Sequence, residues 1–306
     1  MDHLIVLIHW FMAALFVGWG IYFVYCLVRF RSREGHQASV ALPKATASKY
    51  SEIVVVVIEA VLLLGFSVPI WARVRGPSHA PPSSEALVVR VVGEQFAWNV
   101  HYPGVDGEFG VSHPGLMSAE NPLGLDRSQP DAADDIVTIN QFHVPVNKDI
   151  LVHLTSKDVI HSFGLPLLRV KQDMIPGMSI PVWFRATRTT RDVREDLVRT
   201  YSTTEDTAIL STHVAMREYG APDGIPLAAK GDLLTPAVLT ALAEAGIDRI
   251  EAAPEVPTEI ACAQLCGLGH YRMRGFLHVE TQEEYDEWMS KEQQWLQGDE
   301  EGYDAY

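Results

Sequence analysis

Two long apolar stretches near the N-terminus constrain this chain most, because each is long enough to cross a membrane. The first, residues 4–28, contains no charged side chain, and about 20 apolar residues suffice for a helix to span a hydrocarbon core about 30 Å thick. It is too long for the apolar part of a signal peptide, and no small-residue cleavage site precedes the basic residues that follow. The second stretch covers residues 53–72. We therefore predict a transmembrane two-helix hairpin over residues 1–76.

The segment between the two apolar stretches is basic. Its positively charged residues include Arg29, Arg31, Arg33, Lys44 and Lys49. Short basic loops stay on the cytoplasmic side of a membrane, so the N-terminus and everything after Arg75 are expected on the opposite side. We predict a protein of a bacterial-type inner (plasma) membrane with two spans, whose soluble part lies on the periplasmic or outer side.

Two carboxylates accompany the second apolar stretch. Glu52 lies at its cytoplasmic end and Glu59 lies inside it. A charged side chain within a membrane is energetically expensive, which makes it a candidate functional residue. A hydrogen bond from Glu59 to a neighbouring subunit explains its presence equally well, and both interpretations stay open.

The chain of 306 residues is acidic, with a formal net charge of −15. This charge argues against binding to nucleic acid and favours a basic partner. Much of it lies between residues 106 and 135, in a loop rich in aspartate and glutamate. The carboxylates of this loop are Asp106, Glu108, Glu120, Asp126, Asp131, Asp134 and Asp135. Such a loop is either ordinary solvated surface or a patch whose negative electrostatic field steers a basic protein to its docking site.

A short segment near the C-terminus carries the residue types of a metal site. Cys262 and Cys266 are four positions apart, and His270 and Met273 follow them. Thiolate and imidazole ligands select copper or zinc, and a thioether ligand is typical of copper sites that transfer electrons. The pattern therefore favours copper. A disulfide between the two cysteines and a zinc site are the alternatives.

A second segment, Val159–Pro166 with its continuation Leu168–Met178, accompanies this pattern. Together with the cysteine segment, it resembles subunit II of the haem–copper terminal oxidases, the cytochrome c oxidase type. The resemblance implies a dinuclear copper centre called CuA, in which two copper ions share two bridging thiolates. The ligands that it implies are His161, Cys262, the backbone carbonyl of Gln264, Cys266, His270 and Met273.

The soluble part is predicted to be all-β. Residues 77–84 are rich in proline and serine and are predicted to form a linker. Predicted strands cover residues 86–92, 136–139, 150–154 and 180–184. Short strands at such spacing indicate a Greek-key sandwich. The resemblance implies, more specifically, a cupredoxin-like barrel formed by residues 85–186 and 258–281.

Residues 187–257 depart from the family pattern, in which the barrel leads to the cysteine segment within a strand and a turn. We interpret them as a small inserted α/β module with a helix at 232–244 and a strand at 248–252. The module contains His213 but no recognisable cluster of metal ligands. Residues 282–306 are predicted to form a polar C-terminal helix followed by an acidic tail.

The resemblance also implies roles for residues outside the copper site. Phe96 stands where the family has a tryptophan that receives electrons from cytochrome c, and Trp98 keeps the second aromatic position. Filling of the barrel core is the alternative for both. Glu52 matches an acidic residue that helps protons reach the catalytic subunit, whereas Glu59 departs from the pattern. Gln264 replaces a glutamate whose carboxylate reaches magnesium at the subunit interface, so magnesium is expected to be weak or absent.

We therefore predict subunit II of a proton-pumping respiratory haem–copper oxidase. Its copper centre accepts electrons from a cytochrome c or a dedicated cytochrome or periplasmic donor, within a supercomplex or outside one. The electrons pass to haem in subunit I, where oxygen is reduced to water. Expected partners are subunit I, other oxidase subunits, the donor and membrane lipid. The alternative is a membrane-tethered protein that binds or delivers copper without an oxidase partner, but the hairpin with Glu52 favours the oxidase.

Overall fold

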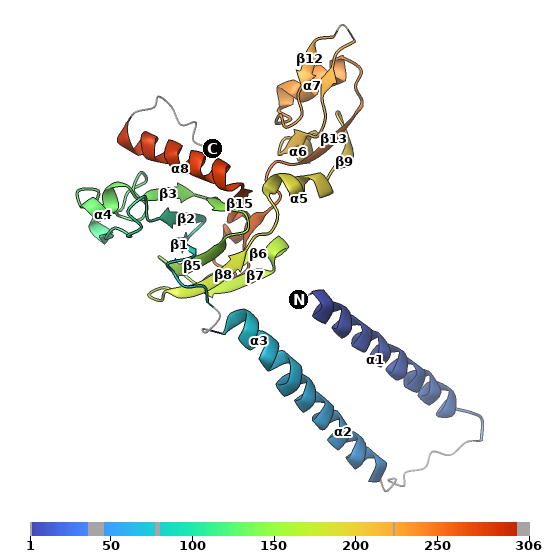
Figure 1. Ribbon diagram of the computed structural model, residues 1–306. Helices are drawn as coiled ribbons and strands as arrows, with labels where there is room; N and C mark the ends of the chain where they lie inside the picture. The colour runs from blue at the N-terminus through green and yellow to red at the C-terminus, as the bar shows by residue number, and fades with distance from the viewer. Residues whose placement is uncertain (1, 36–45, 77–79, 223, 299–306) are drawn as a thin grey trace. The chain divides into compact units, whose positions relative to one another are not determined.

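The computed structural model describes residues 2–35, 46–76, 80–222 and 224–298. The chain divides into two compact units, Met1–Ile70 and Trp71–Tyr306. The first is helical and the second is mostly β-structure (Figure 1). The chain therefore divides into a helical part and a part that is mostly β-structure.

The first unit is made of long apolar helices. Its elements are α1 (Asp2–Arg29) and α2 (Thr46–Leu62), followed by a π-helical turn (Leu63–Ser67) and the first residues of α3 (Val68–Arg75), which continues past Ile70. The stretches Ile5–Arg29 and Lys49–Arg73 are each long and apolar enough to cross a membrane. Most of their side chains are exposed within the described part of the chain, so lipid or a partner protein must cover them.

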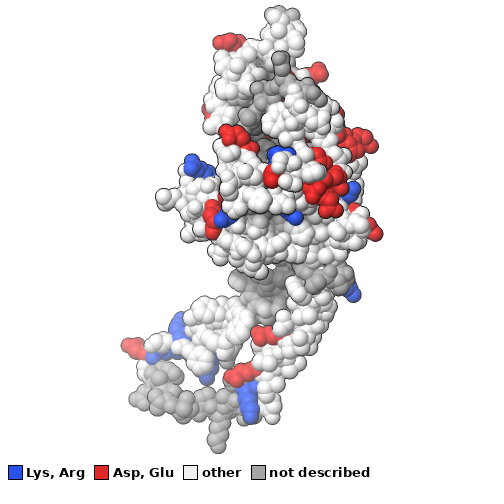
Figure 2. Space-filling model, turned by 90° about the vertical axis from the view of Figure 1, so that its left-hand side faces the viewer, with Lys and Arg blue, Asp and Glu red and all other residues white. Residues whose placement is uncertain are grey.

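The charged residues of this unit are unevenly distributed. Figure 2 shows the helices mostly as uncharged surface, with lysine and arginine gathered near one end. Arg29 ends α1 and Lys49 lies in the first turn of α2, while Lys44 lies outside the described residues. The predicted linker 77–84 is described only from Ala80 onward.

The first sheet of the second unit contains the four strands predicted from the sequence. It consists of β1 (Leu87–Glu94), β2 (Ala97–Tyr102), β3 (Ile136–Ile139), β5 (Asp149–Ser156) and β8 (Ile180–Arg185), in the order β3-β2-β1-β5-β8. Strands β1 and β5 are parallel, and the other neighbours are antiparallel. In β1, Val89 and Val91 are buried and Arg90 between them is exposed. This period of two is what a strand with one buried face requires.

The second sheet contains five strands that the sequence does not predict. They are β4 (Gln141–Pro145), β6 (His161–Leu165), β7 (Val170–Met174), β14 (Glu259–Cys262) and β15 (Arg274–Glu280), in the order β4-β15-β14-β6-β7. Each carries polar, charged or glycine residues among its apolar ones, which weakens the sequence signal. The two sheets share one core that includes Trp98, Phe142, Phe163 and Phe184. The predicted cupredoxin-like all-β sandwich is confirmed.

The acidic loop between β2 and β3 is folded. It contains a 3₁₀ turn (Pro114–Leu116) and the short helix α4 (Pro130–Ala133). Asp135 is fully buried, and its Oδ2 lies 2.6 Å from His101 Nε2. The Asp134 carboxylate accepts a hydrogen bond from the backbone N–H of Val105 at 2.7 Å. These two aspartates hold the loop together, so they are not part of a solvated docking surface.

Between β8 and β14 the chain forms a module with its own core. Its elements are α5 (Thr190–Asp196), β9 (Arg199–Ser202), α6 (Thr207–Leu210), β10 (His213–Ala215), β11 (Tyr219–Gly220), β12 (Pro226–Ala228), α7 (Pro236–Glu244) and β13 (Arg249–Pro254). The strands make a sheet in the order β10-β13-β9 and the hairpin β11-β12. Leu210, Leu234, Leu239 and Ile250 are buried together. The module therefore has an apolar cluster distinct from that of the sandwich.

The helix predicted at 232–244 begins at Pro236. The side chain of Thr235 accepts a hydrogen bond from a backbone N–H of the first turn, which makes Thr235 the N-cap. Asp232 instead accepts a hydrogen bond from a backbone N–H just before it. The strand predicted at 248–252 is present as β13.

The predicted C-terminal helix is α8 (Gln282–Gln297), which packs against the second sheet (Figure 1). Thr281 Oγ1 accepts a hydrogen bond from Glu284 N at 3.2 Å, and Glu284 Oε2 accepts one from Thr281 N at 3.0 Å. This capping box fixes where the helix begins. The Trp288 ring stacks on His143 with ring centroids 4.2 Å apart. The acidic tail from residue 299 onward lies outside the described residues.

Thr281→Ala is expected to lower the free energy of unfolding by about 1 kcal/mol, because it removes the N-cap acceptor of α8. Chemical unfolding of the full chain in detergent, followed by tryptophan fluorescence, measures this change. Ser290→Ala, at an exposed position inside α8, is the matched control and should not destabilise the chain, because alanine has the highest helix propensity. An equal decrease in the free energy of unfolding in the two variants would contradict the role of Thr281 as the N-cap.

Candidate metal centre

The predicted ligands come from two segments about 100 residues apart in the sequence. His161 begins β6, and the other ligands follow from Cys262 at the end of β14. These strands are antiparallel neighbours, and Phe163 pairs with Cys262. The backbone N–H of Ala263 also donates to the carbonyl of Ser162 at 3.0 Å. The backbone ladder therefore places His161 beside the start of the cysteine loop.

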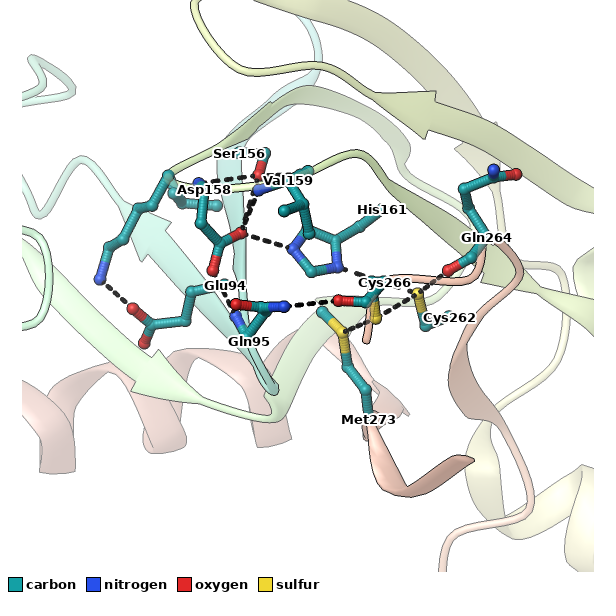
Figure 3. Close-up of polar contacts among 12 residues, drawn as sticks. Glu94, Gln95, Ser156, Asp158, Val159, His161, Cys262, Gln264, Cys266 and Met273 are labelled. Atoms are coloured by element: carbon teal, nitrogen blue, oxygen red, sulfur yellow. Dashed lines mark hydrogen bonds and ion pairs between the residues drawn. The ribbon is translucent and has the colours of Figure 1, made fainter. Parts of the chain in front are cut away.

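The two thiols and the two imidazoles lie together. The sulfurs of Cys262 and Cys266 are 3.8 Å apart. His161 Nδ1 is 3.9 Å from the Cys262 sulfur (Figure 3), and His270 Nδ1 is 3.6 Å from the Cys266 sulfur. Each sulfur thus has one imidazole of its own.

A weaker donor accompanies each sulfur. The Gln264 carbonyl oxygen is 3.2 Å from the Cys262 sulfur, and the Met273 sulfur is 3.7 Å from the Cys266 sulfur. The Gln264 side chain is exposed, and its amide points away from the sulfurs (Figure 3). Only the backbone of this residue faces the site. The fold therefore gathers all six predicted ligands into one cluster.

The sulfur geometry fits a shared metal ion better than a disulfide. Both cysteines are free, whereas a disulfide needs sulfurs about 2.0 Å apart. A thiolate sulfur lies about 2.3 Å from a bound zinc ion, so two sulfurs that share an ion of this kind can be up to about 4.6 Å apart. Burial, with a smaller contribution from Cys262, raises the pKa of the Cys266 thiol to about 11. Metal binding must therefore displace this proton.

The donor set favours copper over zinc. A structural zinc ion takes four tetrahedral ligands from cysteine, histidine and carboxylate. Here four further donors surround the two thiol sulfurs, and they include a thioether and a carbonyl. A weak thioether ligand is typical of copper sites that transfer electrons. His161, Cys266 and Met273 are buried, so the site could hold copper away from water.

Asp158 and Gln95 connect the two ligand-bearing segments, and the sequence predictions missed both. Asp158 Oδ1 lies 2.8 Å from His161 Nε2, and Asp158 Oδ2 accepts from Gln95 N at 2.7 Å. The Gln95 side chain donates to the Cys266 carbonyl at 2.6 Å. Burial opposes ionisation of Asp158, but hydrogen bonds from His161 and from backbone N–H groups outweigh it and lower its pKa. The sequence did contain one signal that could have identified Asp158, since its carboxylate lies three residues before the predicted ligand His161.

The two aromatic residues predicted to receive electrons lie at the site in different ways. Trp98 is fully buried, and its ring stands edge-on to His161 and Phe163 with centroids 6.3 Å and 5.9 Å away. Phe96 is half-buried and lies against Gly269, where an added Cβ would come within 2.4 Å of its ring. Trp98 is thus a core residue beside a ligand, and Phe96 covers the cysteine loop.

Three large side chains of the cysteine loop are open to solvent. Leu265 is 77% exposed, Tyr271 is 85% exposed and Leu268 is 98% exposed. Exposed apolar surface of this kind marks sites of interaction with other proteins. The segment that carries most of the ligands therefore also offers a surface suited to a partner.

The residues predicted to take up protons are not part of this site. Glu52 and Glu59 lie in α2 of the first unit, and both side chains are exposed. In the inserted module, His213 is buried with its ring against Tyr201. Among the described residues, the only group of three or more potential metal-binding His, Cys, Asp and Glu side chains is the one at the cysteine loop.

Gly269→Ala is expected to lower the free energy of unfolding by about 1–3 kcal/mol, because the added methyl group would push against the Phe96 ring. Gly115→Ala is the matched control, since nothing lies within 4 Å of its Cβ position. Chemical unfolding of the full chain measures both. In a double-mutant cycle, the losses from Gly269→Ala and Phe96→Ala should not add, because the second change removes the clash. Additive losses would show that the clash is not the cause.

The second unit matches a known domain family. A family model described as "Cytochrome C oxidase subunit II, periplasmic domain" matches residues 87–191. This range includes β1 to β8 and His161, and it ends where the inserted module begins. The family resemblance inferred from the sequence is confirmed.

Known relatives extend the match along the chain. The alternative cytochrome c oxidase subunit 2 of Bradyrhizobium diazoefficiens is 26% identical over 292 residues, which are 95% of this chain and 79% of the relative. The cytochrome c oxidase subunit 2 of Cereibacter sphaeroides is 35% identical over 115 residues, covering 33% of this chain and 37% of the relative. The solved periplasmic domain of cytochrome oxidase subunit II (CoxB) of Bradyrhizobium japonicum is 21% identical, with a TM-score of 0.36, and the match covers 71% of this chain and 99% of that structure. The sandwich of this chain therefore matches the periplasmic domain of cytochrome c oxidase subunit II, and a relative described as subunit 2 matches along most of its length.

Proposed function

We propose that this chain is the electron-accepting subunit of a membrane-bound haem–copper oxidase. In this proposal its dinuclear copper centre receives electrons from a cytochrome c or a dedicated donor. The electrons continue to haem in subunit I, where oxygen is reduced to water and protons are translocated. The observation that carries the proposal is the pairing of two thiols 3.8 Å apart with one imidazole and one weaker donor each.

Each ligand has a distinct task in this proposal. Copper bridged by two thiolates supplies reversible one-electron transfer when it is bound. Cys262 and Cys266 would provide the thiolates that hold the copper, and His161 and His270 would each supply one imidazole. The β6–β14 ladder and the hydrogen bonds of the loop fix these donors in advance. Donors that are already in place need little rearrangement when an electron arrives, which favours fast transfer.

The burial of the donors also bears on the alternative of copper delivery. A delivery protein must release its metal to a recipient. Here His161, Cys266 and Met273 are buried, and the donors come from two segments joined by a backbone ladder. Such a site is suited to keeping copper in place, which supports the oxidase.

The proposal also places the chain in a membrane. The two candidate spans hold the chain in the inner membrane, with the copper domain on the periplasmic or outer side. Glu52 and Glu59 would then lie where protons enter subunit I. The exposed amide of Gln264 replaces a carboxylate that a hard cation such as magnesium prefers. We therefore expect copper to be retained and magnesium to bind weakly or not at all.

The full chain, purified in detergent and loaded with copper, is expected to bind two copper ions that share one unpaired electron. Electron paramagnetic resonance should show hyperfine coupling to two equivalent copper nuclei. Cys262→Ser should abolish this signal, because a hydroxyl cannot replace a bridging thiolate. Cys26→Ser, at a cysteine of α1, is the matched control and should leave the signal unchanged. A four-line signal from one copper nucleus in the unmodified chain would refute the proposal.

The inserted module offers a test of how the donor docks. Phe96 lacks the indole N–H of the family's tryptophan, and the insert adds a separate surface to the domain. We propose that a dedicated donor, a cytochrome or small periplasmic carrier, is positioned partly by this module. The alternative is that the module has no role in docking. Such an insertion can be tolerated, because the entropic cost of a surface insertion rises slowly with its length.

Arg199 and Ala252 face each other across the β9–β13 ladder, so the segment between them can be replaced by a short linker. Helix α5 should stay in place, because Thr190 Oγ1 accepts a hydrogen bond from Val279 N at 2.8 Å. In the oxidase purified from native membranes, the excision is expected to slow turnover with the native donor at least several-fold. Turnover with an artificial reductant and the copper content are the controls and should not change. Unchanged turnover with the native donor and with the artificial reductant would show that the module has no role in docking the donor.

A further inference from the structure

We propose that Asp158 is a positioning residue of the metal centre, whose carboxylate holds the His161 ring in the tautomer and orientation that present Nδ1 to Cys262. The inference deepens the proposed function and rests on it, since it takes His161 as a copper ligand. It assigns a role to a residue that is not itself a ligand.

The hydrogen-bond geometry determines the tautomer. Asp158 Oδ1 lies 2.8 Å from His161 Nε2. An ionised carboxylate can only accept hydrogen bonds, so Nε2 must carry the hydrogen, and the neutral ring is left with its lone pair on Nδ1. Nδ1 is the atom that lies 3.9 Å from the Cys262 sulfur. The ring is fully buried, so the Asp158 carboxylate, and not solvent, contacts Nε2 in the unmodified chain.

The other sides of the ring are already closed. A Cβ at Gly93 would lie 3.0 Å from His161 Cδ2, so the backbone of β1 lies directly against the ring. The Trp98 ring stands edge-on to it. These contacts limit how far the ring can tilt, and the hydrogen bond of Nε2 is made to Asp158. Asp158 supplies the contact that selects one nitrogen over the other.

The carboxylate is itself held in place. Val159 N donates to Asp158 Oδ1 at 2.6 Å, and Gln95 N donates to Oδ2 at 2.7 Å (Figure 3). The side chain of Gln95 then donates to the Cys266 carbonyl at 2.6 Å. One chain of hydrogen bonds thus runs from His161 through Asp158 and Gln95 to the second thiol segment. Carboxylates that bind the outer nitrogen of a ligand histidine fix its orientation and raise its basicity.

A purely local role is the competing explanation. Asp158 could serve only to shape the turn that leads into β6, since it also accepts a hydrogen bond from the next backbone N–H. Its loss would then lower the free energy of unfolding without changing which nitrogen of His161 carries the hydrogen. The two explanations differ in a property that can be measured with and without metal.

The metal-free test is the tautomer of His161 in the full chain in detergent micelles, read from ¹⁵N-histidine NMR. We expect the Nε2–H form alone in the unmodified chain, a mixture of tautomers in Asp158→Ala, and an intermediate result in Asp158→Asn, which keeps one neutral acceptor. Glu94→Gln is the matched control, because Glu94 is a neighbouring carboxylate that contacts Lys157 and Asn99 instead of a ligand. It should leave the tautomer unchanged. An unchanged tautomer in Asp158→Ala would overturn the inference.

The copper-loaded test uses pulsed electron paramagnetic resonance, which detects the outer nitrogen of each ligand histidine separately. Asp158→Ala should change the quadrupole coupling of one histidine and not the other, and copper affinity should fall about 10- to 100-fold. Failure of the unmodified chain to bind copper would refute the proposed function, while the metal-free tautomer would still decide the role of Asp158. Normal copper binding, with identical histidine signals in all variants, would refute the inference alone.

Discussion

The antiparallel pairing of β6 with β14 is the interaction on which the candidate metal centre depends. It brings His161 to Cys262 across about 100 residues of sequence. Closing so long a connection costs conformational entropy, and the burial of Phe163 and Ile260 in the sandwich core offsets that cost. The site is therefore stable only as far as the sandwich is. Substitutions in the core of the second sheet should therefore displace the predicted metal ligands, even where the substituted residue contacts none of these ligands.

A different ladder, the pairing of β9 with β13, explains how a module can be inserted beside the site without disturbing it. Strands β9 and β13 are antiparallel, so the chain leaves the sandwich and returns to it at nearly the same place. The module buries its own apolar residues and contributes no ligand. Its attachment through Thr190 and through the ion pair of Arg191 with Glu284 joins it to β15 and α8. Strand β14 can then end at Cys262 with its register intact.

The sequence predicts those parts of the structure that local patterns determine. The capping box at Thr281 and the alternating residues of β1 are local signals, and both elements are found where expected. The six predicted ligands were identified from residue type, spacing and the family resemblance together, and the structure places them in one cluster. The second sheet was missed because its strands are stabilised by pairing and burial far along the chain. The buried Asp135 and the contact of Asp158 with His161 also depend on tertiary structure, so neither could be read from composition.

In the proposed function, two thiols, each with its own imidazole, hold two metal ions side by side. X-ray absorption spectroscopy at the copper edge of the loaded full chain can detect this pair of ions, because it reports which atoms surround each absorbing ion. We expect sulfur and nitrogen neighbours together with a short copper–copper contact that is lost in Cys266→Ser. A spectrum of sulfur and nitrogen neighbours without any second copper in the unmodified chain would contradict it.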